Sequence, residues 1–395
     1  MLFDFAVIFV SAFLLYWLFE KARLPGILGM LLAGALLGPQ LLGYISVDAM
    51  RYADELRLAA LIVILIRAGL GIDRATLNKI GLPAALMGVV PCLFEGAAVY
   101  WMARSFFDFS VAEAGMTGFI LAAVSPAVIV PQMIELREAG YGRERHIPTL
   151  VLAAASFDDV IAITFFSIFA GLLTGQVALA SQLLTIPLSI GIALIAGAAT
   201  GWLLLKLFER SNMGNTRMAL IFMVAAILLT ELETRHIIPI ASLLAVMAMG
   251  FIILEKNKTI AGKLSGSFAH IWVAAEVVLF VALGASVDYE AAIQPGAMTM
   301  GLLFIGGGLT ARSIGVWLSL SVSSDIPAQE KLFCVLAFTP KATVQAAIGA
   351  IPLSLGAANG DTILAIAVLS IVITAPLGAL LIRGLGPQML NRTSQ

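Results

Sequence analysis

The sequence predicts an all-α protein that crosses a membrane about thirteen times and is built from two inverted six-helix repeats. Of its 395 residues, 61% are hydrophobic and 12% are charged, whereas soluble proteins carry about 25% charged residues. Most of its 23 lysines and arginines fall on one side of the predicted spans. Two spans at matching positions of the repeats are interrupted by proline and polar residues. Together these observations favour a polytopic membrane protein with paired discontinuous helices.

Hydrophobic runs separated by charged clusters or by clusters of glycine and proline define the spans. A helix needs about 20 apolar residues to cross the bilayer core, and no stretch between the runs is long enough for a soluble domain. We therefore expect residues 1–395 to form one membrane domain with its functional residues inside the bilayer. The spans are centred near residues 3–19, 24–43, 55–72, 80–104, 111–135, 147–171, 180–207, 216–232, 237–254, 269–287, 296–321, 330–353 and 361–384.

The distribution of basic residues orients these spans. Most of them lie in the loops that precede even-numbered spans or in the tail, and the opposite loops hold only Arg51, Arg57, Arg104 and Arg235. Because cytoplasmic loops carry the excess of basic residues, we expect an external N-terminus and a cytoplasmic C-terminus in a plasma or inner membrane. The lipid bilayer is the expected surrounding. A net charge of −1 without a basic run argues against a nucleic-acid partner.

The thirteen spans divide into six, one and six. A six-span unit repeated seven spans later is inverted with respect to the membrane, and inverted repeats are typical of secondary transporters. We expect the first repeat at residues 1–172, a linking helix at 173–212 and the second repeat at 213–395. Spans five and twelve are then counterparts, and they contain S-P-A-V-I-V-P and T-P-K-A-T-V-Q.

These two motifs predict breaks at mid-depth, because proline within a helix removes a backbone hydrogen bond and clashes with the preceding turn. Broken helices direct half-helix dipoles and freed carbonyls towards a substrate site. For the lysine in span twelve two roles stay open: a counter-charge to the freed carbonyls, or direct competition for Asp158 or Asp159. The candidate residues at the two breaks are Ser125, Pro126, Lys341, Thr343 and Gln345.

Asp158 and Asp159 are the only charged residues in span 147–171. Asp158 lies about 11 residues from its start, roughly halfway across a ~30 Å core at ~1.5 Å per residue. Ionised carboxylates are costly there unless protons or cations neutralise them. Adjacent helix positions point ~100° apart, so both side chains can border one cavity. We interpret the pair as a titratable metal site for sodium or lithium.

Glu95 in span four and Arg312 in span eleven also occupy counterpart positions of the two repeats. Opposite charges at similar depth are expected to pair, because either alone would be costly in the bilayer. The pair either holds the two repeats together or takes part directly in ion coupling. Arginine stays protonated in proteins, so Arg312 cannot itself carry the transported proton.

A secondary antiporter accounts for the inverted repeats, the breaks and the carboxylate pair together. A cation channel would also place acidic residues at depth, but it does not need two titratable groups on one helix. An intramembrane aspartyl protease needs carboxyls that face one another from separate helices. We therefore expect a transporter that is not an enzyme, and no residue pattern requires a cofactor.

Five stretches resemble monovalent cation:proton antiporters, most closely the sodium/hydrogen exchanger B subfamily and its bacterial relatives. The resemblance covers nearly the whole membrane domain. It implies the sodium/proton antiporter fold with crossed discontinuous helices, alternating access, and a homodimer with a dimerisation domain and a mobile core domain. The stretches are I-L-I-R-A-G-L-G-I-D, V-S-P-A-V-I-V-P, G-Y-G-R-E-R-H-I-P-T-L, A-A-S-F-D-D-V-I-A-I-T and F-T-P-K-A-T-V-Q-A.

The resemblance also implies that Asp158 and Asp159 bind sodium or lithium in exchange for protons, with potassium/proton exchange as the alternative. Electrogenic relatives carry a lysine at the position of Arg312, whereas the exchanger B group has an arginine paired with the glutamate matched by Glu95. A lysine-release mechanism is therefore not implied. Because both aspartates can release protons, the sequence favours exchange that moves net charge. The long terminal extensions of the animal proteins are absent from this sequence, which favours a prokaryotic plasma membrane.

Overall fold

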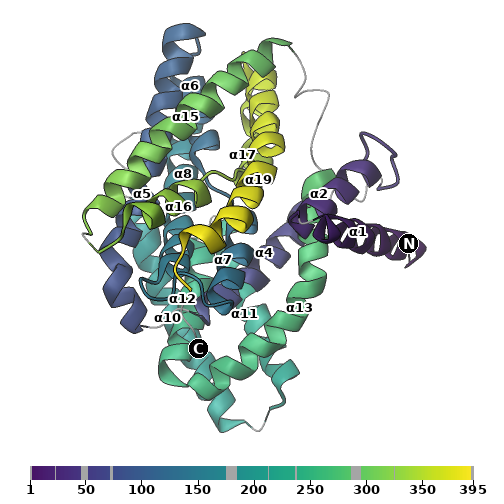
Figure 1. The fold of residues 1–395 in the computed structure, drawn as a ribbon, viewed down its shortest axis with the longest axis vertical. Coiled ribbons are helices and arrows are strands. Elements are labelled where there is room, and N and C mark those ends of the chain that lie inside the picture. Colours follow the sequence, from purple (N-terminus) through teal and green to yellow (C-terminus); the bar gives the residue numbers. More distant parts are fainter. Residues whose placement is uncertain are drawn as a thin grey trace. The chain divides into compact units, whose positions relative to one another are not determined.

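The computed structural model describes residues 2–22, 24–45, 52–71, 74–174, 185–211, 213–235, 238–285, 295–323 and 325–392. Regular structure in these ranges is helical, apart from an isolated bridge between Tyr141 and Arg392 (Figure 1). The predicted all-α fold class is thus confirmed. The helices are α1 (Leu2–Lys21), α2 (Gly26–Leu37), α4 (Ala53–Gly69), α5 (Arg74–Phe106), α6 (Val111–Ala122), α7 (Pro126–Glu138), α8 (Ile147–Leu173), α10 (Thr185–Arg210), α11 (Asn215–Thr234), α12 (Ser242–Lys256), α13 (Lys258–Ala285), α15 (Pro295–Ser321), α16 (Ala328–Ala337), α17 (Thr343–Ile348), α18 (Ile351–Ser354) and α19 (Gly360–Met389).

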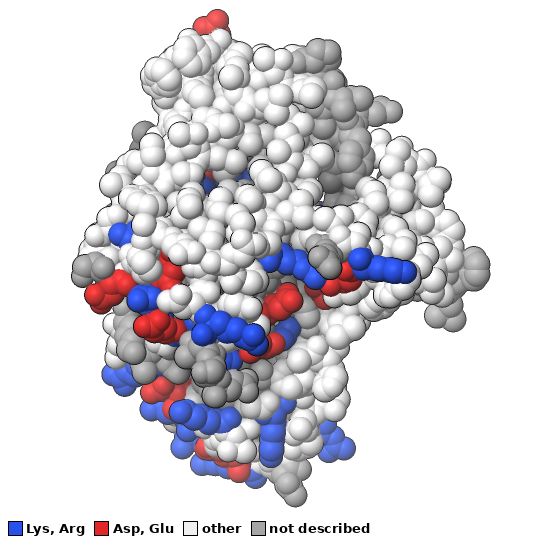
Figure 2. Space-filling model, viewed as in Figure 1, with Lys and Arg blue, Asp and Glu red and all other residues white. Residues whose placement is uncertain are grey.

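The helices have the length and surface of membrane-spanning segments. Within the described ranges, eight helical stretches are long and apolar enough to cross a membrane, and α2 and the α17–α18 stretch are shorter apolar segments. Each predicted span overlaps a described helix or a pair of helices joined by a break. The number of thirteen crossings stays a prediction. Figure 2 shows a face on which uncharged residues cover a wide area, and large side chains such as Trp202 and Leu203 are exposed.

The chain packs as two units. One comprises Met1–Asp54, Leu82–Gln182 and Phe280–Gln395, and the other comprises Glu55–Gly81 and Leu183–Leu279. This division follows helix packing and not the order of the repeats, so the repeat boundaries stay a prediction. Every candidate site residue lies in the first unit.

The second unit is held by close helix contacts. α10 and α12 pack along their lengths, and Gly201 on α10 allows this approach because a Cβ there would lie 2.6 Å from the carbonyl oxygen of Met249. Small residues permit such close helix packing in membranes, where no hydrophobic force drives helices together.

The first unit contains both predicted breaks, which the structure confirms. α6 ends at Ala122 and α7 begins with Pro126, a position where proline's missing N–H is no loss. α16 ends at Ala337 and α17 begins at Thr343. α6 packs against α8, and α15 packs against α16 and α19 (Figure 1). The helices around the breaks therefore frame one buried site.

Candidate functional site

The two broken helices cross and satisfy each other's freed polar groups. The backbone N–H of Ser125 donates to the carbonyl oxygen of Pro340 at 2.8 Å. The Gln345 side chain on α17 donates from Nε2 to the carbonyls of Ile120 at 2.7 Å and Ala123 at 2.9 Å. A backbone group left unpaired at this depth would be costly. The crossing is therefore fixed by hydrogen bonds in both directions.

Asp158 on α8 lies fully buried against this crossing. Its Oδ2 accepts from the backbone N–H of Val124 at 2.9 Å, and its Oδ1 accepts from Nη1 of Arg312 at 3.0 Å. The N–H of Val124 is free to donate because the residue follows the end of α6. Both carboxylate oxygens of Asp158 therefore have a partner, and its negative charge faces a fixed cation.

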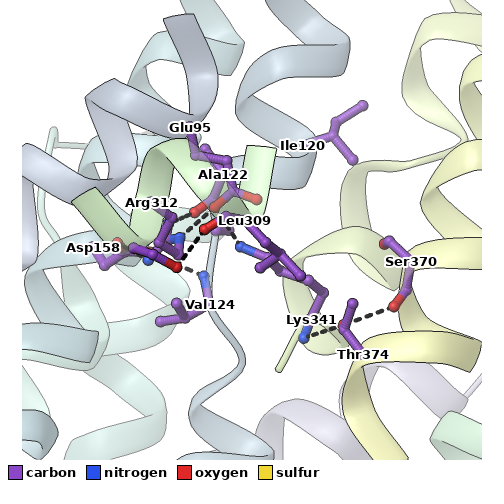
Figure 3. Close-up of polar contacts among 12 residues, drawn as sticks. Glu95, Ile120, Ala122, Val124, Asp158, Leu309, Arg312, Lys341, Ser370 and Thr374 are labelled. Carbon is purple, nitrogen blue, oxygen red and sulfur yellow. Dashed lines mark hydrogen bonds and ion pairs between the residues drawn. The ribbon is translucent and has the colours of Figure 1, made fainter. Parts of the chain in front are cut away.

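Arg312 on α15 is the centre of the polar cluster (Figure 3). Its side chain is 1% exposed, and it also donates to the Glu95 carboxylate from Nε and to the Ala122 carbonyl from Nη2. A guanidinium presents five donors in a rigid fork, which lets one side chain join α5, the end of α6 and α8. The structure thus brings Glu95 and Arg312 together and adds Asp158 to them.

Lys341 lies in the break between α16 and α17, and its side chain is 2% exposed. Its Nζ donates to Glu95 Oε2 at 2.7 Å, so Glu95 has two cationic partners. The hydrogen bond shown for this ammonium thus corresponds to neither of the two roles considered from the sequence. Its backbone N–H donates to Thr374 Oγ1 on α19 at 2.8 Å, and that hydroxyl donates to the carbonyl of Ser370 at 2.7 Å (Figure 3).

Asp159 differs from its neighbour. It is 6% exposed, and its Oδ1 has no hydrogen-bond partner among the described residues. Three other buried oxygens near the two breaks also have none: Ser125 Oγ, Thr343 Oγ1 and Gln345 Oε1. A buried polar atom without a partner costs about 1–3 kcal/mol, so water, a proton or a cation would stabilise these atoms.

The donor set is made of oxygen atoms and does not resemble a transition-metal site. Among the described residues no group of three or more His, Cys, Asp and Glu could hold a metal ion. The described buried side-chain atoms without a partner near the two breaks are carboxylate, hydroxyl and amide oxygens. In potassium channels, rings of backbone carbonyl oxygens replace the hydration shell of the ion, which shows that neutral oxygens can bind a monovalent cation.

The charges of the cluster balance without Asp159. Glu95 and Asp158 are acidic, Arg312 and Lys341 are basic, and all four are joined by ion pairs. The fifth group, Asp159, adds a negative charge whenever it is ionised without a bound cation. The cluster is neutral when Asp159 holds either one proton or one monovalent cation.

Comparison with known proteins identifies the family. The profile of the family described as sodium/hydrogen exchanger, transmembrane, matches residues 9–385. The chain belongs to the sodium/hydrogen exchanger family. The resemblance to cation:proton antiporters seen in its motifs is thereby confirmed.

Animal exchangers are similar over most of this exchanger. Sodium/hydrogen exchanger 9B2 of Homo sapiens is 31% identical over 381 residues, which cover 93% of this chain and 70% of the relative. Sodium/hydrogen exchanger 9B1 of Homo sapiens is 32% identical over 410 residues, which cover 99% and 78%. The solved sodium proton antiporter MjNhaP1 from Methanocaldococcus jannaschii aligns with a TM-score of 0.78 over 98% of both chains at 19% identity. That structure shows the shared fold.

The polar cluster includes groups that the sequence pattern did not single out. The Thr374 hydroxyl anchors the break that carries Lys341 and donates to the backbone carbonyl of Ser370, and the backbone of Ala122 and Val124 holds Arg312 and Asp158. Thr374 could have been found from the sequence, because it is a polar residue in the apolar helix α19. The backbone groups of Ala122 and Val124 could not have been found in this way, because a backbone group leaves no signal in the sequence.

Proposed function

We propose that this exchanger moves sodium or lithium against protons by alternating access, with the two ions competing for Asp159. The observation that supports this is the buried Oδ1 of Asp159, which has no hydrogen-bond partner within the described ranges, although the ion-paired groups next to it balance one another's charge. An ionised carboxylate without a counter-ion is costly inside a bilayer. A proton must therefore leave Asp159 when the cation binds, and the cation must leave when a proton binds. This competition couples the two fluxes.

The proposal gives Asp158 and Asp159 different roles. Asp158 keeps its hydrogen bonds to Arg312 and Val124 and positions the site, while Asp159 titrates. Ser125, Thr343 and Gln345 provide oxygen ligands from the two breaks, beside Pro126, which starts α7. We further propose a homodimer in the plasma or inner membrane with an external N-terminus.

The cation preference can be tested by dissipation of an imposed pH gradient in proteoliposomes. Sodium and lithium should each collapse the gradient at concentrations at which potassium has little effect, because small hard cations suit a site of few oxygen ligands. Protein-free liposomes serve as the control. A potassium response equal to that of sodium would favour the potassium/proton alternative, and sodium flux without proton movement would favour a channel.

The contacts favour a stoichiometry different from the one that the sequence suggested. Because Asp158 is paired with Arg312, one proton on Asp159 is exchanged for one monovalent cation, and no net charge moves. A pH gradient should therefore drive sodium flux without current on a solid-supported membrane. The rate should not change when potassium and valinomycin impose a membrane potential, although moving one net charge would be worth ~2.3 kcal/mol per 100 mV. A transport current that scales with sodium would contradict this assignment.

A further inference from the structure

Two buried glutamates occupy the same position in two counterpart helices. Glu113 is the third residue of α6, and Glu330 is the third residue of α16. These helices are the first halves of the two broken spans, and each leads to one of the breaks at the site. The two side chains are 4% and 2% exposed. Glutamate is rarely buried to this extent unless it is paired, so the contacts of both residues are informative.

Glu113 joins the start of α6 to the start of α19. Its Oε2 accepts from the backbone N–H of Ser110 at 2.9 Å, and the Ser110 hydroxyl accepts from the backbone N–H of Glu113 at 3.2 Å, which forms a capping box. Its Oε1 accepts from the backbone N–H of Asn359, directly before α19, at 2.8 Å. A capping box needs only the contacts with Ser110. The contact with Asn359 is additional and ties two helices together.

Glu330 makes a corresponding contact at the other end of the α6–α7 span. Arg145 lies beyond the end of that span, two positions before α8 begins. Its Nη1 donates to Glu330 Oε1 at 3.3 Å, and its Nε donates to the carbonyl of Asp325, which precedes α16, at 2.7 Å. Glu144 also lies 3.5 Å from Nη1, but its side chain is 59% exposed. The start of α16 is thus tied to the start of α8.

These two end contacts, α6 to α19 and α8 to α16, join helices that also meet around the crossing. α8 and α19 each pack against both α6 and α16. Asp159 lies 12 residues after the first residue of α8, which is about 18 Å along the helix axis. Two helices that touch only near the crossing can pivot about it, whereas a second contact about 18 Å away prevents this rotation. The end contacts therefore fix where Asp159 lies relative to the two breaks.

We propose that Glu113 and the Glu330–Arg145 pair are positioning groups for the transported cation. They hold the four helices so that Asp159 and the oxygens of the two breaks bind one ion together, as a precise site requires of its supporting contacts. The proposal rests on the proposed function, because it takes the same cation and ligands. A cation needs several oxygens from different helices at once, whereas a proton needs one carboxylate. Loss of an end contact should therefore weaken cation binding and leave proton binding to Asp159 unchanged.

The kinetic test measures the KM for sodium in proteoliposomes over a range of pH. Glu113→Ala and Arg145→Gln should each raise this KM about 3- to 10-fold at alkaline pH, because one lost hydrogen bond is worth up to about tenfold in an equilibrium constant. The maximal rate should change less than about 2-fold, and the pH at which competing protons double the KM should shift by less than about 0.3. A substitution that only destabilises the protein would lower the maximal rate and leave the KM unchanged.

Each variant has a matched control in the same segment. Ser110→Ala removes the other half of the capping box but leaves Glu113 in contact with α19. Arg143→Gln makes the same chemical change as Arg145→Gln in the same turn, and the Arg143 side chain donates to two carbonyls at the end of α7. Both controls should keep the KM for sodium within about 2-fold of the wild-type value.

A binding measurement covers any variant that transports too slowly for kinetics. Sodium that binds the folded state raises its melting temperature, so the sodium concentration that gives half of this rise in detergent should increase by the same factor as the KM. An unchanged sodium dependence in Glu113→Ala or Arg145→Gln, or an equal increase in its control, would overturn the proposal. Normal exchange by Asp159→Asn would instead contradict the proposed function, so the two failures are distinguishable.

Discussion

Replacement of Asp159 by asparagine should abolish exchange, down to the rate of protein-free liposomes, while the protein stays folded. Asparagine has nearly the same shape, but it is neutral and cannot exchange a proton for a cation. Because Asp159 Oδ1 has no partner among the residues that the structure describes, the substitution breaks no described hydrogen bond to that oxygen. The measurement is sodium-driven proton movement in proteoliposomes, normalised to the amount of reconstituted protein.

The matched variant is Asp158→Asn. It should also impair exchange, but it should in addition lower the melting temperature in detergent, because it removes one of the two anionic partners of Arg312. The two neighbouring substitutions would thus separate ion binding from site stability. Wild-type turnover in the Asp159→Asn protein would refute its role as the exchanging group.

Arg312→Gln should be the most destabilising substitution in the cluster. It leaves the buried carboxylate of Asp158 without its cation and removes one of the two partners of Glu95. Breaking a buried ion pair by removing one partner costs roughly 3–5 kcal/mol. Thermal unfolding in detergent should show a large fall in the melting temperature. The exposed Arg235→Gln offers the same chemical change at a surface ion pair and should leave the melting temperature nearly unchanged.

A double-mutant cycle then tests whether Arg312 and Glu95 interact. Glu95→Gln alone leaves Lys341 without its carboxylate, so each single variant should be destabilised. The double variant should be more stable than the sum of the two losses predicts, because the opposite charges disappear together. Strictly additive losses would show that the two side chains do not interact energetically.

Much of this fold could be predicted because the bilayer imposes a simple rule on sequence. Every span must be long and apolar, so any charge at depth is conspicuous, as Asp158, Glu95 and Arg312 are. Proline in an apolar run likewise marks a break, and both breaks lie where Pro126 and Pro340 indicate. These signals are local and therefore readable one residue at a time.

The partners within the site could not be predicted in the same way. Which carboxylate Lys341 reaches depends on how two breaks cross, and Asp158 takes its second hydrogen bond from the backbone of Val124. Backbone groups have no sequence signature, because every residue except proline carries both a donor and an acceptor. The resulting asymmetry between Asp158 and Asp159 changes the expected stoichiometry, although the two residues are chemically identical.

The crossing of the broken helices also constrains how the chain can be made. The N–H of Ser125 finds its acceptor at Pro340, and Glu95 finds its cations at Arg312 and Lys341. At ~5–20 residues per second, a ribosome needs roughly 10 to 40 s to synthesise the intervening chain. For that time the first half sits in or beside the membrane with an open helix end and an unpaired glutamate. Its polar groups must be covered by water or by the insertion machinery until the last third of the chain arrives.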